Sequence, residues 1–275
     1  MNNHFTMKEA LADTESRHVL GLSGGKDSAA LAIHIKDNYP ELHSKMEYFF
    51  SDTGAELQEV YDFLNVLESY LGKEILRIGS GRPFEHWLKV HNDYLPSVQQ
   101  RWCTRTMKII PFEKYVGDGS VISYIGIRAD ENRDGYISRK PNIKAVFPFK
   151  EDELERDDIY QILRDTVGIP KYYEWRSRSG CYFCFFQRQD EWLGLKRNHP
   201  ELFEKAKQIE EKSGNGYTWV QGKTLDEVVA HAEKKELEKG IIHKTHSTDK
   251  ERWQSMLMNM EEDDAEDQSC LICSL

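Results

Sequence analysis

Short apolar runs alternate with segments of helical periodicity along the first half of the chain. The apolar or β-rich runs cover residues 19–22, 46–51, 75–78 and 121–127. Helical patterns lie between them, over residues 28–37, 57–70 and 83–89. Strands that alternate with helices are typical of a parallel sheet that helices cover on both faces. The pattern therefore predicts an α/β fold built on a doubly wound, mostly parallel sheet.

Polar and glycine-rich segments follow each of these predicted strands. They cover residues 23–28, 51–56, 79–82 and 126–133. In open parallel sheets, ligands bind beyond the carboxyl ends of the strands. We therefore expect the four segments to meet at one edge of the sheet and to form the functional site there.

The pattern changes after about residue 150. Amphipathic or charged helices are predicted over residues 152–167, 189–212, 225–239 and 249–260, and an acidic run follows at 261–268. We predict an α/β domain over residues 1–168. A cysteine motif with a helical C-terminal region follows over 169–260, and a flexible acidic tail over 261–275.

Composition sets limits on the class of protein. The chain has 275 residues, of which 39% are hydrophobic, so it can bury a real core. No apolar run approaches the length of a membrane span, and the first residues show no basic-then-apolar signal peptide. We expect a cytoplasmic protein with no membrane partner. The net charge of −10 argues against a broad basic face that coats nucleic acid, although it leaves room for a local basic groove.

The segment after the first predicted strand reads Ser-Gly-Gly-Lys-Asp-Ser, and its members are Ser23, Gly24, Gly25, Lys26, Asp27 and Ser28. A strand, a glycine turn and a helix together present backbone N–H groups to phosphate. The two glycines let the backbone approach an anion, the two serines can donate hydrogen bonds, and the lysine adds a cation. The spacing is not that of the Walker loop. A generic Ser/Gly turn before a helix is the alternative.

The same segment resembles the S-G-G-x-D-S pyrophosphate loop of the N-type ATP pyrophosphatases. This resemblance implies a five-stranded adenine nucleotide alpha hydrolase-like fold, which is Rossmann-like. It also implies that ATP is split between its α and β phosphates and that AMP is transferred to a substrate.

The second predicted strand ends at Asp52, Thr53 and Gly54. A carboxylate in this position can hold Mg²⁺ or bond a ribose or base, and Thr53 can cap the following helix. The alternative is that Asp52 is only a helix cap. Together with Glu56 and Tyr61, this stretch resembles the D-T-G-x-E-x-x-x-x-Y-x-F segment of the phosphoadenylyl-sulfate (PAPS) reductase family.

The segment after the fourth run contains Gly126, Arg128 and Arg133. Gly126 permits close approach of a nucleotide, and the arginines could clamp phosphate or sulfate bidentately. A solvated charged loop is the alternative. The stretch resembles the G-I-R-x-x-E-S-x-x-R block of the PAPS reductase family, with Asn132 where serine is usual. Further blocks match in order, so the resemblance covers about residues 17–195.

Cys181 and Cys184 form a C-x-x-C motif, and Cys103 precedes them after a long gap. Arginines just before the motif favour thiolates, which can bind a metal. The arrangement resembles the iron–sulfur pattern of the adenylylsulfate (APS) reductase branch, although Trp102 replaces its first upstream cysteine. The resemblance implies a [4Fe-4S] cluster held by Cys103, Cys181 and Cys184. Zinc, or reduced cysteines packed among aromatic side chains, are the alternatives.

Cys270 and Cys273 lie in the acidic tail. They could carry sulfur to the site or supply a fourth ligand, or they could dock as a small apolar plug. The tail lacks the E-C-G-[IL]-H motif of the reductases, which argues against reduction of an adenylylated sulfate.

Residues 95–97 and 101–111 resemble the ATP pyrophosphatase component of DNA phosphorothioation systems. This implies ATP and Mg²⁺ bound at the glycine loop, Asp52, Thr53, Gly126 and Arg128, with Lys26, Asp27 and Arg128 as catalytic residues. The implied partners are a cysteine desulfurase, other modification-system subunits and DNA held through them, and a homodimer is compatible. The alternatives are an APS or PAPS reductase, a tRNA-thiolating ATP pyrophosphatase and a non-catalytic nucleotide-binding regulator.

Overall fold

The structure is a computed structural model that describes residues 5–132, 140–213 and 216–239. It divides into two compact units. Unit 1 comprises the described residues of Met1–Phe84 and Trp102–Pro170, and unit 2 those of 85–101 and 171–239. Residues 85–101, which the sequence places inside the α/β domain, therefore group with the C-terminal part of the chain.

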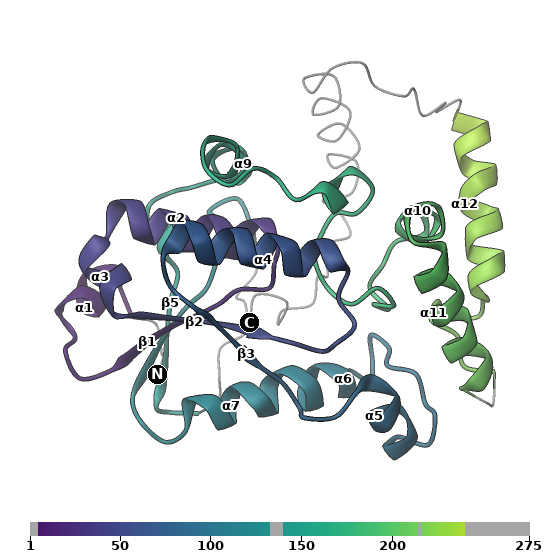
Figure 1. The fold of residues 1–275 in the computed structure, drawn as a ribbon, viewed down its shortest axis with the longest axis horizontal. Coiled ribbons are helices and arrows are strands. Elements are labelled where there is room, and N and C mark those ends of the chain that lie inside the picture. Colours follow the sequence, from purple (N-terminus) through teal and green to yellow (C-terminus); the bar gives the residue numbers. More distant parts are fainter. Residues whose placement is uncertain (1–4, 133–139, 214–215, 240–275) are drawn as a thin grey trace. The chain divides into compact units, whose positions relative to one another are not determined.

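Unit 1 is built on five parallel strands in the order β3-β2-β1-β4-β5 (Figure 1). The strands are β1 (Arg17–Gly21), β2 (Met46–Ser51), β3 (Ile75–Ile78), β4 (Val121–Tyr124) and β5 (Ile143–Val146). The predicted α/β fold with a parallel five-stranded sheet is confirmed. The strand order reverses between β1 and β4, and such a switch point is where ligands bind in open α/β sheets.

The central strands are mostly apolar and buried because helices cover both faces of the sheet, whereas β3, at the sheet edge, is partly exposed. In Figure 1, α2 (Lys26–Asn38) and α4 (Gln58–Leu71) lie along one face, and α7 (Ile110–Val116) lies along the other. On the α7 side, one buried cluster joins the helix to four strands through Val19, Phe49, Phe112, Val116, Val121 and Ile143. Phe49 and Phe112 stack with ring centroids 5.2 Å apart.

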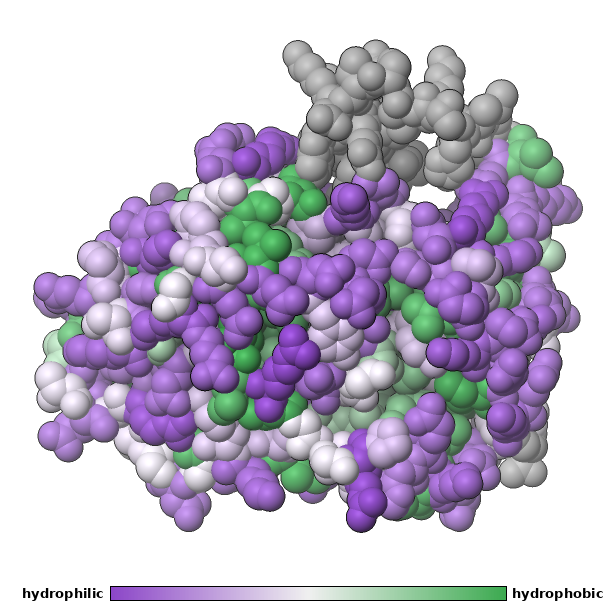
Figure 2. Space-filling model, viewed as in Figure 1, coloured by the Kyte–Doolittle hydropathy of each residue, from purple (hydrophilic) through white to green (hydrophobic). Residues whose placement is uncertain are grey.

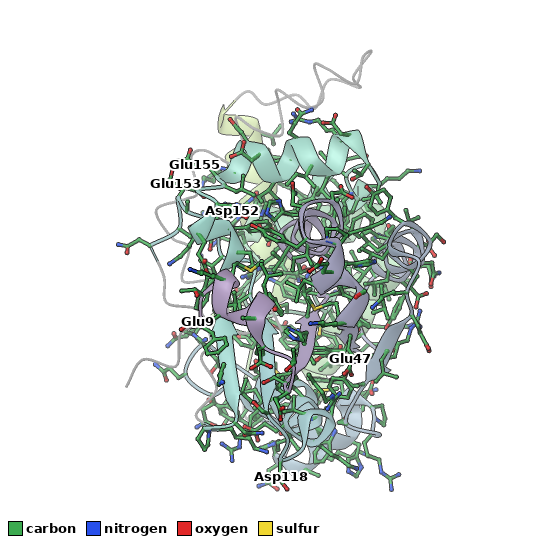
Figure 3. The ribbon with its side chains drawn as sticks, turned by 90° about the vertical axis from the view of Figure 1, so that its left-hand side faces the viewer. Glu9, Glu47, Asp118, Asp152, Glu153 and Glu155 are labelled. Atoms are coloured by element: carbon green, nitrogen blue, oxygen red, sulfur yellow. The ribbon has the colours of Figure 1, made fainter. Side chains whose placement is uncertain are left out.

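The remaining helices of unit 1 are short. They are α1 (Met7–Ala12), α3 (Pro40–Lys45), α6 (Trp102–Thr104), a π-helical turn (Arg105–Ile109), α8 (Pro148–Glu151) and α9 (Arg156–Asp165), while α5 (Phe84–Val90) begins at the unit boundary. The link between α8 and α9 is tied to α2 by Asp152, which is labelled in Figure 3. Its carboxylate bonds the Nε2 of His34 at 2.7 Å and accepts from the Tyr39 hydroxyl at 3.1 Å.

The described residues of unit 2 include most of α5, a 3-10 turn (Lys171–Glu174) and the helices α10 (Gln189–Asn198), α11 (Pro200–Lys212) and α12 (Leu225–Lys239). The helix predicted over residues 225–239 is confirmed, since α12 has the same bounds. The single helix expected over residues 189–212 is wrong, because Pro200 starts a second helix. Proline has no N–H to donate and disfavours helical backbone in the residue before it, here His199.

Hydrophilic side chains cover most of the face that Figure 2 shows. In the part of the chain that the structure describes, no helix is long and apolar enough to cross a membrane. The predicted helix over 249–260 and the acidic tail lie outside the described residues.

Candidate functional site

The segments that follow β1, β2, β3 and β4 begin at the same edge of the sheet. The N–H of Leu22, just after β1, donates to the carbonyl of Phe49 in β2 at 2.7 Å. The N–H of Asp52, just after β2, donates to the carbonyl of Ile78 in β3 at 2.8 Å. Sheet hydrogen bonding therefore continues into the first residue of each segment. Gly79 allows the segments after β2 and β3 to pack closely, because a Cβ at this position would lie only 2.9 Å from the carbonyl oxygen of Asp52. The carboxyl edge of the sheet thus brings together the polar segments that the sequence singled out.

The glycine loop is compact and folds over the start of α2. Gly24 has φ +74°, and a Cβ on it would lie only 2.6 Å from Cγ1 of Val60 on α4. Gly25 is the N-cap of α2, so Lys26 and Asp27 lie in the first helical turn, two residues earlier than the predicted helix start. The Ser23 N–H donates to Oγ of Ser28 at 3.2 Å, and the two hydroxyl oxygens are also 3.2 Å apart. Ser23 in the loop and Ser28 in the first turn of α2 therefore lie together at the N-terminus of a 13-residue helix.

The three predicted catalytic residues form one charged cluster at this helix start. Nζ of Lys26 lies 3.0 Å from Oδ2 of Asp27, and Nη1 of Arg128 lies 3.1 Å from Oδ1 of the same carboxylate. Gly126 makes this contact between β4 and α2 possible, because a Cβ there would lie 3.1 Å from the Asp27 carbonyl oxygen. Lys26 and Arg128 are both 8% exposed, so their charges are largely removed from water.

Electrostatics keep this cluster ionised. Burial raises the pKa of Asp27, but the positive charges of Lys26 and Arg128 outweigh it and lower that pKa below its ordinary value. Burial lowers the pKa of Arg128, and the neighbouring carboxylates outweigh it, so the guanidinium pKa is raised. Asp27 is therefore a carboxylate and Arg128 a cation over the whole physiological pH range.

The surroundings of Arg128 differ from the expected phosphate clamp. Its Nε lies 2.9 Å from Oδ1 of Asp130 and its Nη1 lies 2.8 Å from Oε1 of Glu131, in addition to the contact with Asp27. A phosphate that binds this guanidinium would compete with carboxylates already in place. The second predicted clamp residue, Arg133, lies outside the described residues.

Asp52 is held in a hydrogen-bonded turn after β2. Its Oδ1 accepts from the Gly54 N–H at 2.8 Å and from the Tyr61 hydroxyl at 2.9 Å. The same hydroxyl lies 3.2 Å from Oε2 of Glu56. Burial and the two carboxylates raise the pKa of Tyr61, so its hydroxyl stays protonated and donates. Sequence reasoning missed Tyr61 and Glu56 as partners of Asp52, although both belong to the motif quoted for this stretch.

The capping role expected of Thr53 is wrong. Its hydroxyl donates to Oε1 of Glu56 at 2.7 Å, whereas α4 begins at Gln58 with Leu57 as its N-cap. The reading of Asp52 as a helix cap is excluded for the same reason. Both side chains instead shape the loop between β2 and α4, on the carboxyl edge of the sheet.

The donor set at this edge fits Mg²⁺ that arrives with a nucleotide. Among the residues that the structure describes, no group of three or more His, Cys, Asp or Glu side chains could hold a metal by itself. Magnesium usually takes one or two carboxylates together with substrate phosphates and waters. Asp52 is half-buried, fixed through one carboxylate oxygen, and placed where the sheet's ligands bind.

The Tyr61→Phe variant tests how Asp52 is held. Losing the hydroxyl removes the 2.9 Å bond to the carboxylate and leaves the ring in place. For the ATP turnover proposed below, we expect the Mg²⁺ concentration that gives the half-maximal rate to rise about fivefold, which corresponds to one hydrogen bond of about 1 kcal/mol. A Mg²⁺ titration of initial rates measures it. Tyr70→Phe, a hydroxyl change on the same helix, is the control, and equal responses of the two variants would contradict the assignment.

The predicted cysteine centre is divided between the two units. Cys103 belongs to α6 of unit 1. Cys181 and Cys184 lie on a tight turn of unit 2, in which the Cys184 N–H donates to the Cys181 carbonyl at 3.1 Å. The Nη2 of Arg176 donates to that carbonyl at 2.7 Å. The turn supplies two thiols for a metal that needs four ligands. A centre that also includes Cys103 stays a prediction, and Cys270 and Cys273 lie outside the described residues.

A buried carboxylate organises the arginines around this turn. Glu191 is fully buried and accepts from the N–H and the hydroxyl of Ser177, at 2.7 and 2.6 Å, and from the N–H of Arg188 at 3.0 Å. Burial raises the pKa of Glu191, but the charges of nearby arginines, Arg176 foremost, outweigh it and lower that pKa.

The Glu191→Gln variant should lose stability in a pH-dependent way. Because the folded-state pKa lies below its ordinary value of 4.5, the carboxylate stabilises the fold above that pH, and the stabilisation is lost as the pH falls further. At pH 7 we expect the free energy of unfolding to drop by about 2 kcal/mol. Denaturant unfolding between pH 3 and 7 should show a shallower acid limb for this variant than for wild type or for the exposed control Glu211→Gln. Parallel acid limbs would contradict the prediction.

The chain is similar to one known domain family and to several known proteins. Residues 17–149 match the phosphoadenosine phosphosulfate reductase domain. An uncharacterized protein of Methanocaldococcus jannaschii is 28% identical over 221 residues, which make up 74% of this chain and 44% of that protein. An uncharacterized nin region protein of Escherichia phage lambda is 27% identical over 211 residues, 65% of this chain and 68% of that protein. The chain spans less than half the length of the archaeal relative.

A solved structure, phosphoadenylyl-sulfate reductase from Candida auris in its phosphate complex, aligns with a TM-score of 0.43 and 14% identity. The alignment covers 55% of this chain and 73% of that one. Cys181 and Cys184 lie beyond the matched domain. The match to the phosphoadenosine phosphosulfate reductase domain over residues 17–149 contains all five strands, the glycine loop, Asp52, Gly126 and Arg128, so the similarity to that family lies in the sheet and in the candidate site at its carboxyl edge.

Proposed function

We propose that the chain is an ATP pyrophosphatase that transfers AMP to a DNA backbone phosphate, as the activating step of sulfur insertion in DNA phosphorothioation. The observation that carries this proposal is the glycine loop at the N-terminus of α2, joined to the cluster of Lys26, Asp27 and Arg128. A helix N-terminus with adjacent glycines and buried cations suits a polyphosphate. The family domain over residues 17–149 supports a nucleotide as ligand.

The reaction begins with attack by a substrate oxygen on the α-phosphorus of ATP. A new P–O bond forms, the bond between the α-phosphorus and the bridging oxygen breaks, and pyrophosphate leaves with that oxygen. The loop N–H groups and Lys26 stabilise the negative charge that grows on the leaving group. Arg128 adds positive charge and, through Asp27, holds the ammonium group of Lys26 in place. Asp52 would hold Mg²⁺, which supplies further charge neutralisation when bound.

In the second step a sulfur nucleophile at the oxidation level of hydrosulfide attacks the adenylylated phosphorus and displaces AMP. A cysteine desulfurase, together with a thiol reductant, would supply that sulfur, and other modification-system subunits would hold the DNA. The cysteines Cys103, Cys181 and Cys184 are candidates to bind a [4Fe-4S] cluster or zinc in such a pathway, although no step is assigned to that centre.

The test is product analysis with α-labelled ATP and Mg²⁺ in the presence of DNA. We expect AMP and pyrophosphate, with label transiently on DNA, and a sharp loss in the Ser23→Ala variant. ADP and orthophosphate as products would overturn the proposal. Transfer of label to tRNA and not to DNA would retain the ATP chemistry and change the acceptor.

A second candidate is reduction of an adenylylated sulfate, which the description of the matched domain favours. This reaction releases sulfite and consumes a dithiol such as thioredoxin. Sulfite production from PAPS or APS without any pyrophosphate release from ATP would support this candidate over the first.

A further inference from the structure

We propose that unit 2 carries an anion site formed by Arg101, Arg178 and Phe186, and that it binds the phosphodiester backbone of nucleic acid. The choice of nucleic acid rests on the proposed function, whereas the anion site rests on the geometry of unit 2 alone. Arg178 and Phe186 lie beyond the matched residues 17–149, whereas Arg101 lies within them but groups with unit 2. None of the three belongs to the proposed ATP site.

Two guanidinium groups are held on one aromatic ring. The central carbon of Arg101 lies 4.8 Å from the ring centroid of Phe186, and that of Arg178 lies 5.1 Å from the same centroid. The Nη2 of Arg178 also donates to the Phe186 carbonyl, and the ring of Phe185 packs against that of Phe186 at 4.5 Å. The contact with Phe186 fixes the plane of the Arg101 guanidinium and leaves the edges of that group available to hydrogen-bond acceptors.

Arg101 has donors to spare. Its Nε donates to the Val98 carbonyl at 3.1 Å. Within the described residues its two terminal nitrogens make no hydrogen bond, and no carboxylate pairs with it. By contrast, Arg197 of the same unit is paired with Glu236, at 2.9 and 2.8 Å. A half-buried, oriented guanidinium with two unused donor groups is suited to bidentate binding of a phosphate.

The local charge is positive in an acidic chain. Residues 176–188 include three arginines and no aspartate or glutamate, although the whole chain has a net charge of −10. The buried carboxylate of Glu191 offsets part of this positive charge. The charges of Arg176, Arg188 and Arg178 lower the pKa of Glu191, so this group is ionised at neutral pH. Two like charges on one ring lie within roughly 10 Å, the Debye length at 0.1 M salt, so they repel each other. An anion bound between or beside them relieves that repulsion.

A nucleic-acid backbone suits this arrangement better than a base does. Both guanidinium groups already lie on Phe186, so its ring is not a free stacking platform for bases. Phosphate contacts position a strand without reading its sequence, and each strand of DNA carries a charge about every 3.4 Å along its axis. We therefore expect binding that is salt-dependent and nearly independent of sequence.

The experiment measures fluorescence anisotropy of a labelled 12-nucleotide DNA strand, without ATP, at several salt concentrations. The Arg101→Gln variant should bind about tenfold more weakly than wild type, as expected for a charged hydrogen bond. The slope of log affinity against log salt should fall by about 0.7, which is one phosphate contact on a single strand. Arg197→Gln, which removes an equal charge from the same unit, should leave both quantities unchanged. Arg101→Lys should restore the slope and only part of the affinity.

Equal affinities for the Arg101→Gln and Arg197→Gln variants would overturn the site, as would absence of binding by wild type at 50 mM salt. RNA of the same length, bound as well as DNA, would support backbone recognition, whereas strong dependence on base sequence would contradict it. Thermal melts of each variant exclude unfolding as the cause. Because the assay contains no ATP, a chain that binds DNA and releases no pyrophosphate would refute only the proposed function, and the reverse result would refute only this inference.

Discussion

The Lys26→Met variant is expected to release pyrophosphate at least about a hundredfold more slowly than wild type. Removing one preorganised charge from a water-poor active site typically lowers turnover by 10²–10³-fold. Lys26 is 8% exposed and its ammonium nitrogen lies 3.0 Å from Asp27, in the first turn of α2. Methionine keeps the length and the apolar stem of the side chain. The loss should therefore appear in kcat more than in the stability of the fold.

The matched control is Lys36→Met, the same change ten residues along the same helix. The ammonium group of Lys36 lies over the ring of Tyr70, 3.9 Å from its centroid, and belongs to no part of the site. Pyrophosphate release by this control should stay within about twofold of wild type, because it removes the same charge from a different environment. If the two variants turned over ATP equally fast, Lys26 would have no role in the chemistry.

Gly24→Ala should be the most destabilising single substitution of the glycine loop, by about 3 kcal/mol. Two effects combine in it. A non-glycine residue in the left-handed region costs about 1–2 kcal/mol, and overpacking a filled site costs about 1–3 kcal/mol. Gly24 has φ +74°, and the added Cβ would lie 2.6 Å from Cγ1 of Val60. For a protein of this size the melting temperature should fall by roughly 10 °C.

Two further variants separate the two effects. Gly72 has φ +66° at the end of α4, and a Cβ added to it would meet no atom within 4 Å, so Gly72→Ala should show the backbone cost alone. Val60→Ala removes the obstructing methyl groups. The double variant Gly24→Ala with Val60→Ala should lose less stability than the sum of the two single variants, by about the overpacking share. Additive losses in denaturant unfolding would show that the side chain of Val60 does not confine the loop.

Local sequence was sufficient for four of the five strands and for the edge of the sheet where the site lies, but it missed β5 (Ile143–Val146). The predicted runs at β2 and β3 match the observed strands residue for residue, because each is a short stretch rich in apolar residues. The glycine loop can be recognised from sequence as a candidate phosphate-binding loop because all of its relevant residues are consecutive, from position 23 to position 28. Pro200 also marks the break between α10 and α11, and the prediction of one helix overlooked it.

The partners of the site residues lie far along the chain and could not be read in this way. Asp27 meets Arg128 across 101 positions, because β1 and β4 are neighbours in the sheet. The need for glycine at position 24 comes from Val60 on another helix. The hydroxyl of Tyr61, on α4, donates to the Asp52 carboxylate because the loop between β2 and α4 brings the two residues together.

The sequence by itself determined the α/β class, the position of the glycine loop and the residue types available for binding phosphate. The tertiary structure decided which of those side chains meet: Arg128 with three carboxylates, Arg101 and Arg178 on one ring, and residues 85–101 with unit 2. The physical reason is that hydrophobic periodicity is a local property of the chain. A charged contact depends on strand order and on close packing between segments that are distant in sequence.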